Sequence, residues 1–186
     1  MSEKRKSQAK ILRIVRKIHR TAGILLFVFF FLVSITGFLL GIKKHSGGFI
    51  LPETKTGTST QVSQFLPLDS LQKNAIRFMS AYSKETKEIE IDRIDVRPEK
   101  GIVKFTFKSN FNEIQLDGVT GTLLQIDLRR SDVIEKIHDG SIVDYHFGFE
   151  SGIFKLIYTI IMSFALMTFT ITGFWLWYGP KKMRKS

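Results

Sequence analysis

Cysteine is absent from this chain of 186 residues, and proline and histidine are scarce, with four of each. Without a thiol, the chain cannot form a disulfide scaffold, an iron–sulfur centre, a thiolate zinc site or a haem attached through a Cys-x-x-Cys-His motif. The sequence also lacks a Gly-x-Gly-x-x-Gly fingerprint for dinucleotides. These absences exclude several common cofactor sites.

Charge is nearly absent from two long segments. Ala22–Ile42 has 21 residues with no charge, and Ile153–Tyr178 has 26 residues with Lys155 as its only charge. About 20 apolar residues cross a bilayer core of roughly 30 Å. We therefore predict transmembrane helices at residues 21–43 and 153–178, which excludes a wholly soluble protein. Neither segment holds a pair of aspartates or a His-Glu motif, which argues against an intramembrane protease.

The remaining charge is distributed unevenly. Residues 1–20 hold eight Lys/Arg and one Glu, residues 181–186 hold four Lys/Arg, and residues 43–152 hold fifteen basic and sixteen acidic side chains. The net charge of +11 therefore belongs to the two ends. By the positive-inside rule, both termini face the cytoplasm and the middle of the chain lies outside. Because topology explains the basic ends, we predict no nucleic-acid partner.

The segments around the spans are polar or amphipathic. Residues 1–20 place apolar side chains at helical spacing among basic ones, which predicts an amphipathic cytoplasmic helix. The first apolar run exceeds the 7–15 residues of a signal-peptide core, and no small-x-small cleavage site follows it, so we expect an uncleaved anchor. Residues 44–66 are a predicted linker, residues 131–152 a return segment and residues 179–186 a basic tail.

Residues 67–130 predict a small extracytoplasmic α+β domain. A helix begins near Pro67, and the apolar period then changes from helical to two. The alternation predicts an antiparallel sheet of about four strands with one buried face. The strand segments are Ile89–Val96, Val103–Phe107, Ile114–Leu116 and Leu124–Leu128, and the turns are Pro98–Gly101, Ser109-Asn110 and Asp117–Gly121. A short helix from Ser131 to Ile137 leads back towards the membrane.

Three motifs occur in order along the chain. Ile18-His19-Arg20-x-x-Gly23 precedes an apolar span with Thr36-Gly37-Phe38, and Ile137-His138-Asp139-Gly140 precedes one with Thr172-Gly173-Phe174-Trp175-x-Trp177. Between them, Ile114–Gly121 resembles the strand–turn–strand "D-x-x-T-G" of PepSY domains. In this order the motifs resemble the PepSY-associated transmembrane family. The sequence also repeats itself, because Ser34–Leu40 recurs as Thr170–Leu176.

The resemblance carries implications for fold and function. Some members of the family resemble haem-containing ferric-siderophore reductases of the bacterial inner membrane. It implies a membrane α-helical protein with a PepSY-like domain on the periplasmic or extracellular side. Many relatives have four spans where this chain has two, so the resemblance implies a homodimer that completes a four-helix bundle.

The histidines are the candidate iron ligands, since imidazole is the usual axial ligand of b-type haem. His19 lies on one helical line with small residues, which would let a partner helix or a flat macrocycle approach. His138 lies in the family-like motif at the outer boundary. For both, ligation of haem b and an interfacial, purely structural histidine remain alternatives. The small-residue line below His19 contains Gly23, Leu26, Phe30, Ser34, Gly37 and Gly41.

Other candidates accompany these two. His146 follows His138 by eight residues and would share its face if one helix were continuous, although Gly140 interrupts the segment. Lys155 either extends to the interface or meets a haem propionate or an anionic lipid. Gly173 lies on the same helical line as Lys155 and would face the dimer core.

Two functions follow as hypotheses. The first is an inner-membrane b-type haem protein, an oxidoreductase of the ferric-reductase type if it is an enzyme, that moves electrons across the membrane to an extracytoplasmic ferric complex. Its electron donor would be a quinone or another protein, because no nucleotide signature is present. The alternative is a haem-free accessory protein whose PepSY-like domain binds or restrains a partner protein.

Overall fold

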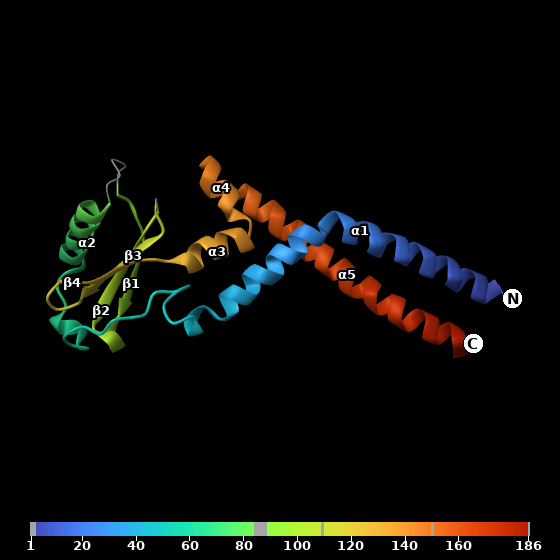
Figure 1. The fold of residues 1–186 in the computed structure, drawn as a ribbon, viewed down its shortest axis with the longest axis horizontal. Helices are drawn as coiled ribbons and strands as arrows, with labels where there is room; N and C mark the ends of the chain where they lie inside the picture. The colour runs from blue at the N-terminus through green and yellow to red at the C-terminus, as the bar shows by residue number, and fades with distance from the viewer. Residues whose placement is uncertain (1–2, 84–88, 109, 150, 186) are drawn as a thin grey trace. The chain divides into compact units, whose positions relative to one another are not determined.

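The computed structural model describes residues 3–83, 89–108, 110–149 and 151–185. The chain divides into two compact units (Figure 1). The helical unit combines residues 1–38 with 136–186, and the mixed unit contains residues 39–135.

The helical unit is built on two long helices that cross, α1 (Glu3–Gly41) and α5 (Ile153–Lys185) (Figure 1). The predicted amphipathic helix and first span are one uninterrupted helix, because no proline or glycine separates them. The second helix continues beyond the predicted span into the basic tail and includes Pro180. A proline costs the helix one backbone hydrogen bond, and here this occurs in the last two turns.

The apolar side chains of both helices point outwards from the unit. Leu25 is 70% exposed and Phe164 is 65% exposed, although both lie mid-helix. Both helices, over Lys6–Gly41 and Ile153–Arg184, are long and apolar enough to cross a membrane. An aqueous protein would bury such side chains, whereas lipid accepts them. The two predicted membrane helices are therefore present.

The return to the second span is a helix–turn–helix. Helix α3 (Arg130–His138) ends at the histidine, and α4 (Ser141–Phe147) begins three residues later. Between them Gly140 adopts a left-handed φ of +78°, and a Cβ there would lie 2.8 Å from the ring of Tyr158. Only glycine fits this turn without strain. The single helix that would have aligned His146 with His138 does not form.

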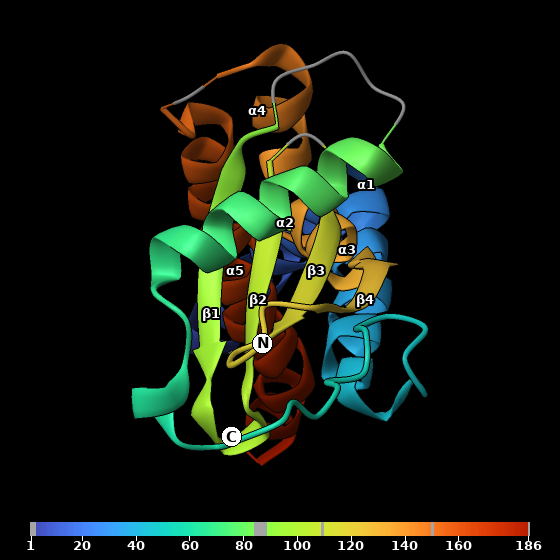
Figure 2. The ribbon, with the colours of Figure 1, turned by 90° about the vertical axis from the view of Figure 1, so that its left-hand side faces the viewer.

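The mixed unit contains the predicted meander. Strands β1 (Ile91–Arg97), β2 (Ile102–Phe107), β3 (Asn112–Asp117) and β4 (Leu123–Leu128) pair antiparallel in the order β1-β2-β3-β4. Helix α2 (Leu68–Tyr82) lies across one face (Figure 2). The first strand begins two residues later than predicted, and the predicted turn at Ser109-Asn110 includes Ser109, which lies outside the described residues. Short 3-10 turns occur at Lys43–His45, Val62–Gln64 and Pro98–Lys100.

Both faces of the central strands are buried, and the prediction of one buried face was wrong. On one face, Leu71, Ala75 and Met79 of α2 pack with the alternate apolar residues of β2 and β3. On the other face Glu113 and Gln115 are also fully buried. This face is covered by residues 53–58, which we call the strap. The Lys55 N–H donates to Gln115 Oε1 at 2.9 Å, and Gln115 Nε2 donates to the Glu53 carbonyl at 2.8 Å.

Candidate functional site

His19 of α1 contacts the Thr-Gly motif of α5. Its Nδ1 lies 2.8 Å from Thr172 Oγ1. A Cβ on Gly173 would lie 3.7 Å from His19 Cε1, so the imidazole reaches α5 where that helix has no side chain. The ring of Phe169 packs on the imidazole with a centroid distance of 4.6 Å. We call this arrangement the His19 site.

His138, the last residue of α3, makes the same contacts with α1. Its Nδ1 lies 2.8 Å from Thr36 Oγ1. A Cβ on Gly37 would lie 3.4 Å from His138 Cε1. We call this arrangement the His138 site. The two sites therefore share one construction, an imidazole received by a Thr-Gly pair on another helix.

Helix α1 contributes to both sites. Helix α1 supplies His19 to one site and Thr36 to the other, and these two residues are separated by about 25 Å along a helix that rises 1.5 Å per residue. The repeated Ile-Thr-Gly-Phe segments are therefore the two receiving surfaces. Sequence reasoning identified both histidines and both glycines but missed Thr36 and Thr172. The internal repeat was the signal that could have revealed them.

The family to which the chain belongs follows from a match over nearly its whole length. The family model described as the PepSY-associated TM region matches residues 3–185. The chain belongs to the PepSY-associated transmembrane family. The resemblance indicated by the motifs is thereby confirmed. No curated protein and no solved structure matches the chain.

In this PepSY-associated protein, both threonine hydroxyls also bond to carbonyls of the preceding helical turn. Thr36 Oγ1 donates to the Leu32 carbonyl at 2.6 Å, and Thr172 Oγ1 donates to the Thr168 carbonyl at 2.6 Å. Both threonines are buried, with 6% and 8% of their surface exposed. Within the described part of the chain, the Nε2 atoms of His19 and His138 have no hydrogen-bond partner. Each histidine thus has one ring nitrogen held and the other free.

Each residue of the His138-Asp139-Gly140 motif has a defined contact or backbone conformation. Asp139 lies 2.6 Å from the Lys155 ammonium and accepts the backbone N–H of Ser141 at 2.9 Å. Burial raises the pKa of Asp139, but the hydrogen bonds from Lys155 and Ser141 outweigh it and hold that pKa below its ordinary value. Lys155 therefore has a carboxylate partner within the protein. Its predicted role towards a haem propionate or a lipid stays a prediction.

One candidate, His146, is not brought to either site. His146 is exposed on α4, and its ring contacts Phe147 at a centroid distance of 5.3 Å. Gly37 and Gly173 each adjoin a histidine of their own chain, and their predicted role in a dimer stays a prediction. Among the described residues, no three His, Asp or Glu side chains gather as a metal cluster. In the part of the chain that the structure describes, each candidate site therefore consists of a single imidazole.

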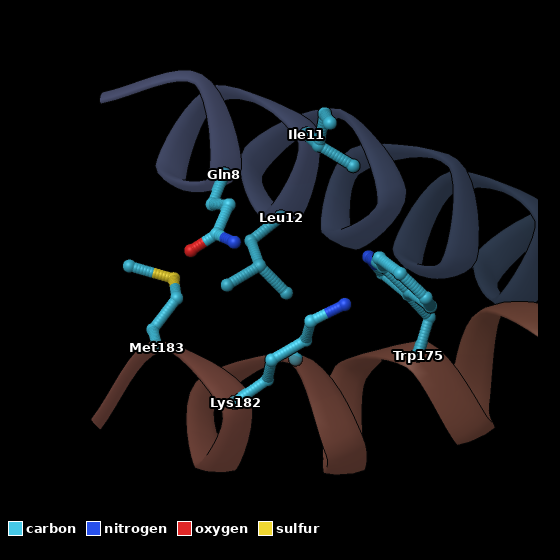
Figure 3. Close-up of a pocket in the computed structure, with 7 residues that line it drawn as sticks. Gln8, Ile11, Leu12, Trp175, Lys182 and Met183 are labelled. Carbon is cyan, nitrogen blue, oxygen red and sulfur yellow. The ribbon is translucent and has the colours of Figure 1, made fainter. Parts of the chain in front are cut away.

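Among the described residues, hollows lie along α1 and α5. An open apolar groove of about 580 Å³ adjoins the His19 site and is lined by Gly23, Phe27, Phe30, Phe31, Ser34, Leu166 and Phe169. A second cavity of about 40 Å³ lies where Gln8 and Leu12 of α1 meet Trp175 and Lys182 of α5 (Figure 3). The smaller cavity suits water molecules rather than a cofactor. The larger groove has the size and apolar lining of a ligand pocket.

Proposed function

We propose that this protein is a b-type haem protein of the bacterial inner membrane that passes electrons across the bilayer as a homodimer. His19 and His138 are the axial ligands, one near each membrane face. The observation that carries the proposal is the shared construction of the two sites. In each, Nδ1 is anchored to a threonine and Nε2 is left for a ligand.

The residues fit such a group. A b-type haem supplies a one-electron iron couple when two imidazoles bind it. Each site in one chain provides one imidazole, so the second would come from the same histidine of a second copy. The glycines beside the two rings remove the side chains that would block a flat macrocycle. An open apolar groove beside Phe169 adjoins the His19 site.

The charge at the two ends of the chain supports an orientation in the membrane, from which a direction of electron transfer follows. The basic ends of the chain favour a cytoplasmic location for both termini and an outer location for the mixed unit. Electrons would enter near the His19 site from a quinone or a protein donor. They would leave near the His138 site, towards an extracytoplasmic ferric complex such as a ferric siderophore.

Absorption spectroscopy of the purified full chain tests the proposal. With haem supplied during expression, we expect a red protein with a six-coordinate, low-spin spectrum on reduction. His19→Ala and His138→Ala should each remove one haem population and leave the other. The matched control is His45→Ala, because His45 is exposed in the turn Lys43–His45. His146→Ala tests the other candidate outer ligand.

One result would contradict the proposed haem protein. A folded, dimeric and colourless preparation, even with haem added, would rule out the haem protein. The haem-free accessory protein would then be the better hypothesis, and capture of partners from native membranes by the mixed unit would be its test.

A further inference from the structure

We infer that Thr36 and Thr172 are positioning residues that hold His138 and His19 as the tautomer protonated at Nδ1, so that Nε2 is the unprotonated, metal-binding nitrogen. The inference deepens the proposed function, because it names the groups that prepare the two ligands. It rests on the direction of four hydrogen bonds.

The bonding of the threonine hydroxyls determines which group donates in each threonine–histidine hydrogen bond. A hydroxyl has one hydrogen to donate and two lone pairs that accept. Thr36 Oγ1 lies 2.6 Å from the Leu32 carbonyl oxygen, and Thr172 Oγ1 lies 2.6 Å from the Thr168 carbonyl oxygen. Carbonyl oxygens only accept, and two oxygens at this distance repel each other unless a hydrogen lies between them. Each hydroxyl hydrogen is therefore committed to its own helix.

The direction of these bonds determines which ring nitrogen of each histidine carries the hydrogen. Each Thr Oγ1 is also 2.8 Å from a histidine Nδ1. Since the hydroxyl hydrogen is already donated, the hydrogen of this second bond must come from the ring. Both histidines are thus Nδ1–H donors, and a neutral imidazole that is protonated at Nδ1 presents a lone pair at Nε2. That lone pair is the ligand an iron requires.

Two independent copies of the arrangement support a shared role. One site joins His19 of α1 to α5, and the other joins His138 of α3 to α1. The threonine–histidine distance is 2.8 Å and the threonine–carbonyl distance is 2.6 Å at both sites. Other hydroxyls of the same helices donate to the preceding turn without meeting a histidine. Thr170 Oγ1 donates to the Leu166 carbonyl at 2.9 Å and Ser34 Oγ donates to the Phe30 carbonyl at 2.7 Å, and both residues are exposed. Thr170, which lies outside the apolar groove, provides the matched control.

The first experiment uses the full chain without haem. Protein labelled with ¹⁵N-histidine is measured by NMR in detergent, and the hydrogen is assigned to a ring nitrogen by its one-bond coupling. We expect His19 and His138 to carry it on Nδ1. Thr172→Val should move the hydrogen of His19 to Nε2 and leave His138 unchanged, while Thr36→Val should do the reverse. Thr36→Ser should restore the wild-type tautomer of His138, and Thr170→Val should change neither histidine.

The second experiment measures haem retention and midpoint potential in the same variants. Loss of a residue that orients a metal ligand typically weakens the site about 10- to 100-fold. We expect that loss at one haem in each valine variant, with the serine variant close to wild type. Nε2-protonated histidines in the wild-type protein, or tautomers indifferent to both valine substitutions, would overturn the inference even if haem binds. Nδ1-protonated histidines in a protein that takes up no haem would leave the inference standing and remove the proposed function.

Discussion

The carboxylate of Asp144 accepts a hydrogen bond of 2.8 Å from the backbone N–H of Lys155. A second bond of 3.1 Å comes from the N–H of Phe154. These donors lie at the start of α5, where a helix leaves its N–H groups without internal partners. Asp144 of α4 therefore caps the second membrane helix.

Removing this cap should destabilise the protein. Asp144→Ala should lower the free energy of unfolding by about 1–2 kcal/mol, the usual cost of losing a helix cap. Asp144→Asn should cost less, because its amide oxygen still accepts. Thermal unfolding in detergent, followed by circular dichroism, measures the difference. An alanine variant as stable as the wild type would show that water replaces the carboxylate.

Gly140 should be intolerant of a side chain. Gly140→Ala combines a left-handed φ with a Cβ placed 2.8 Å from Tyr158, so it should cost more than the about 1–2 kcal/mol of left-handed strain alone. The matched control is Gly148→Ala, where φ is +70° and no atom lies within 4 Å. Unfolding measurements on both variants separate strain from steric contact. Equal losses would mean that Tyr158 moves aside freely.

Gly57 should be needed for the strap to lie on the sheet. A Cβ there would lie 2.1 Å from the Gly101 carbonyl oxygen, and backbone cannot withdraw as a side chain can. Gly57→Ala should break the bond from its own N–H to the Lys100 carbonyl, and hydrogen exchange over residues 53–58 should accelerate. The exposed neighbour provides the control, and Thr56→Ala should leave exchange unchanged. Slow exchange in the Gly57 variant would contradict the packing described.

Asp117 should make the stability of the mixed unit depend on pH. Burial raises its pKa, but hydrogen bonds from the Thr58 hydroxyl and from the N–H groups of Thr120, Val119 and Thr58 hold that pKa below its ordinary value. A carboxyl whose pKa is lower when folded than when unfolded stabilises the fold above the unfolded value and loses this contribution as pH falls. Stability should therefore decline below about pH 4. Asp117→Asn should flatten that decline in denaturant titrations, and an unchanged slope would contradict the assignment.

The proposed orientation has a direct test. Tags at Met1 and Ser186 should be inaccessible from outside intact cells, while a cysteine placed at Asn110 should react with an impermeant reagent. The chain has no native cysteine, so the label reports a single position. Reaction at either terminus would contradict the positive-inside argument.

Local patterns predicted the elements well. The four strands follow from period-two alternation, and the spans follow from uncharged length. Contacts between residues that lie far apart in the sequence were not predicted. Glu113 and Gln115 are polar residues at alternate positions and indicated a solvent-facing strand. Gln115 is instead bonded to Lys55 of the strap, 60 positions away. Glu113 is paired with Lys104 and Arg129. Likewise His19 and Thr172 are 153 positions apart, and no local period connects them.

The breaks between elements were predicted less well. Basic residues marked a boundary between the amphipathic segment and the first span, but helix formation depends on propensity, and Lys and Arg are good helix formers. The helix α1 therefore continues through that boundary. Similarly, the tail after Tyr178 remains helical past a glycine and a proline.

The placement of His19 and Thr36 on one rigid helix has a mechanical consequence. Each residue turns a helix by about 100°, so rotating α1 by a single position would carry His19 away from Thr172 and Thr36 away from His138 in the same movement. Neither contact can be released by turning α1 while the other is kept. The two histidine sites are therefore coupled through α1, and whatever fixes the rotation of α1 at one site also fixes it at the other.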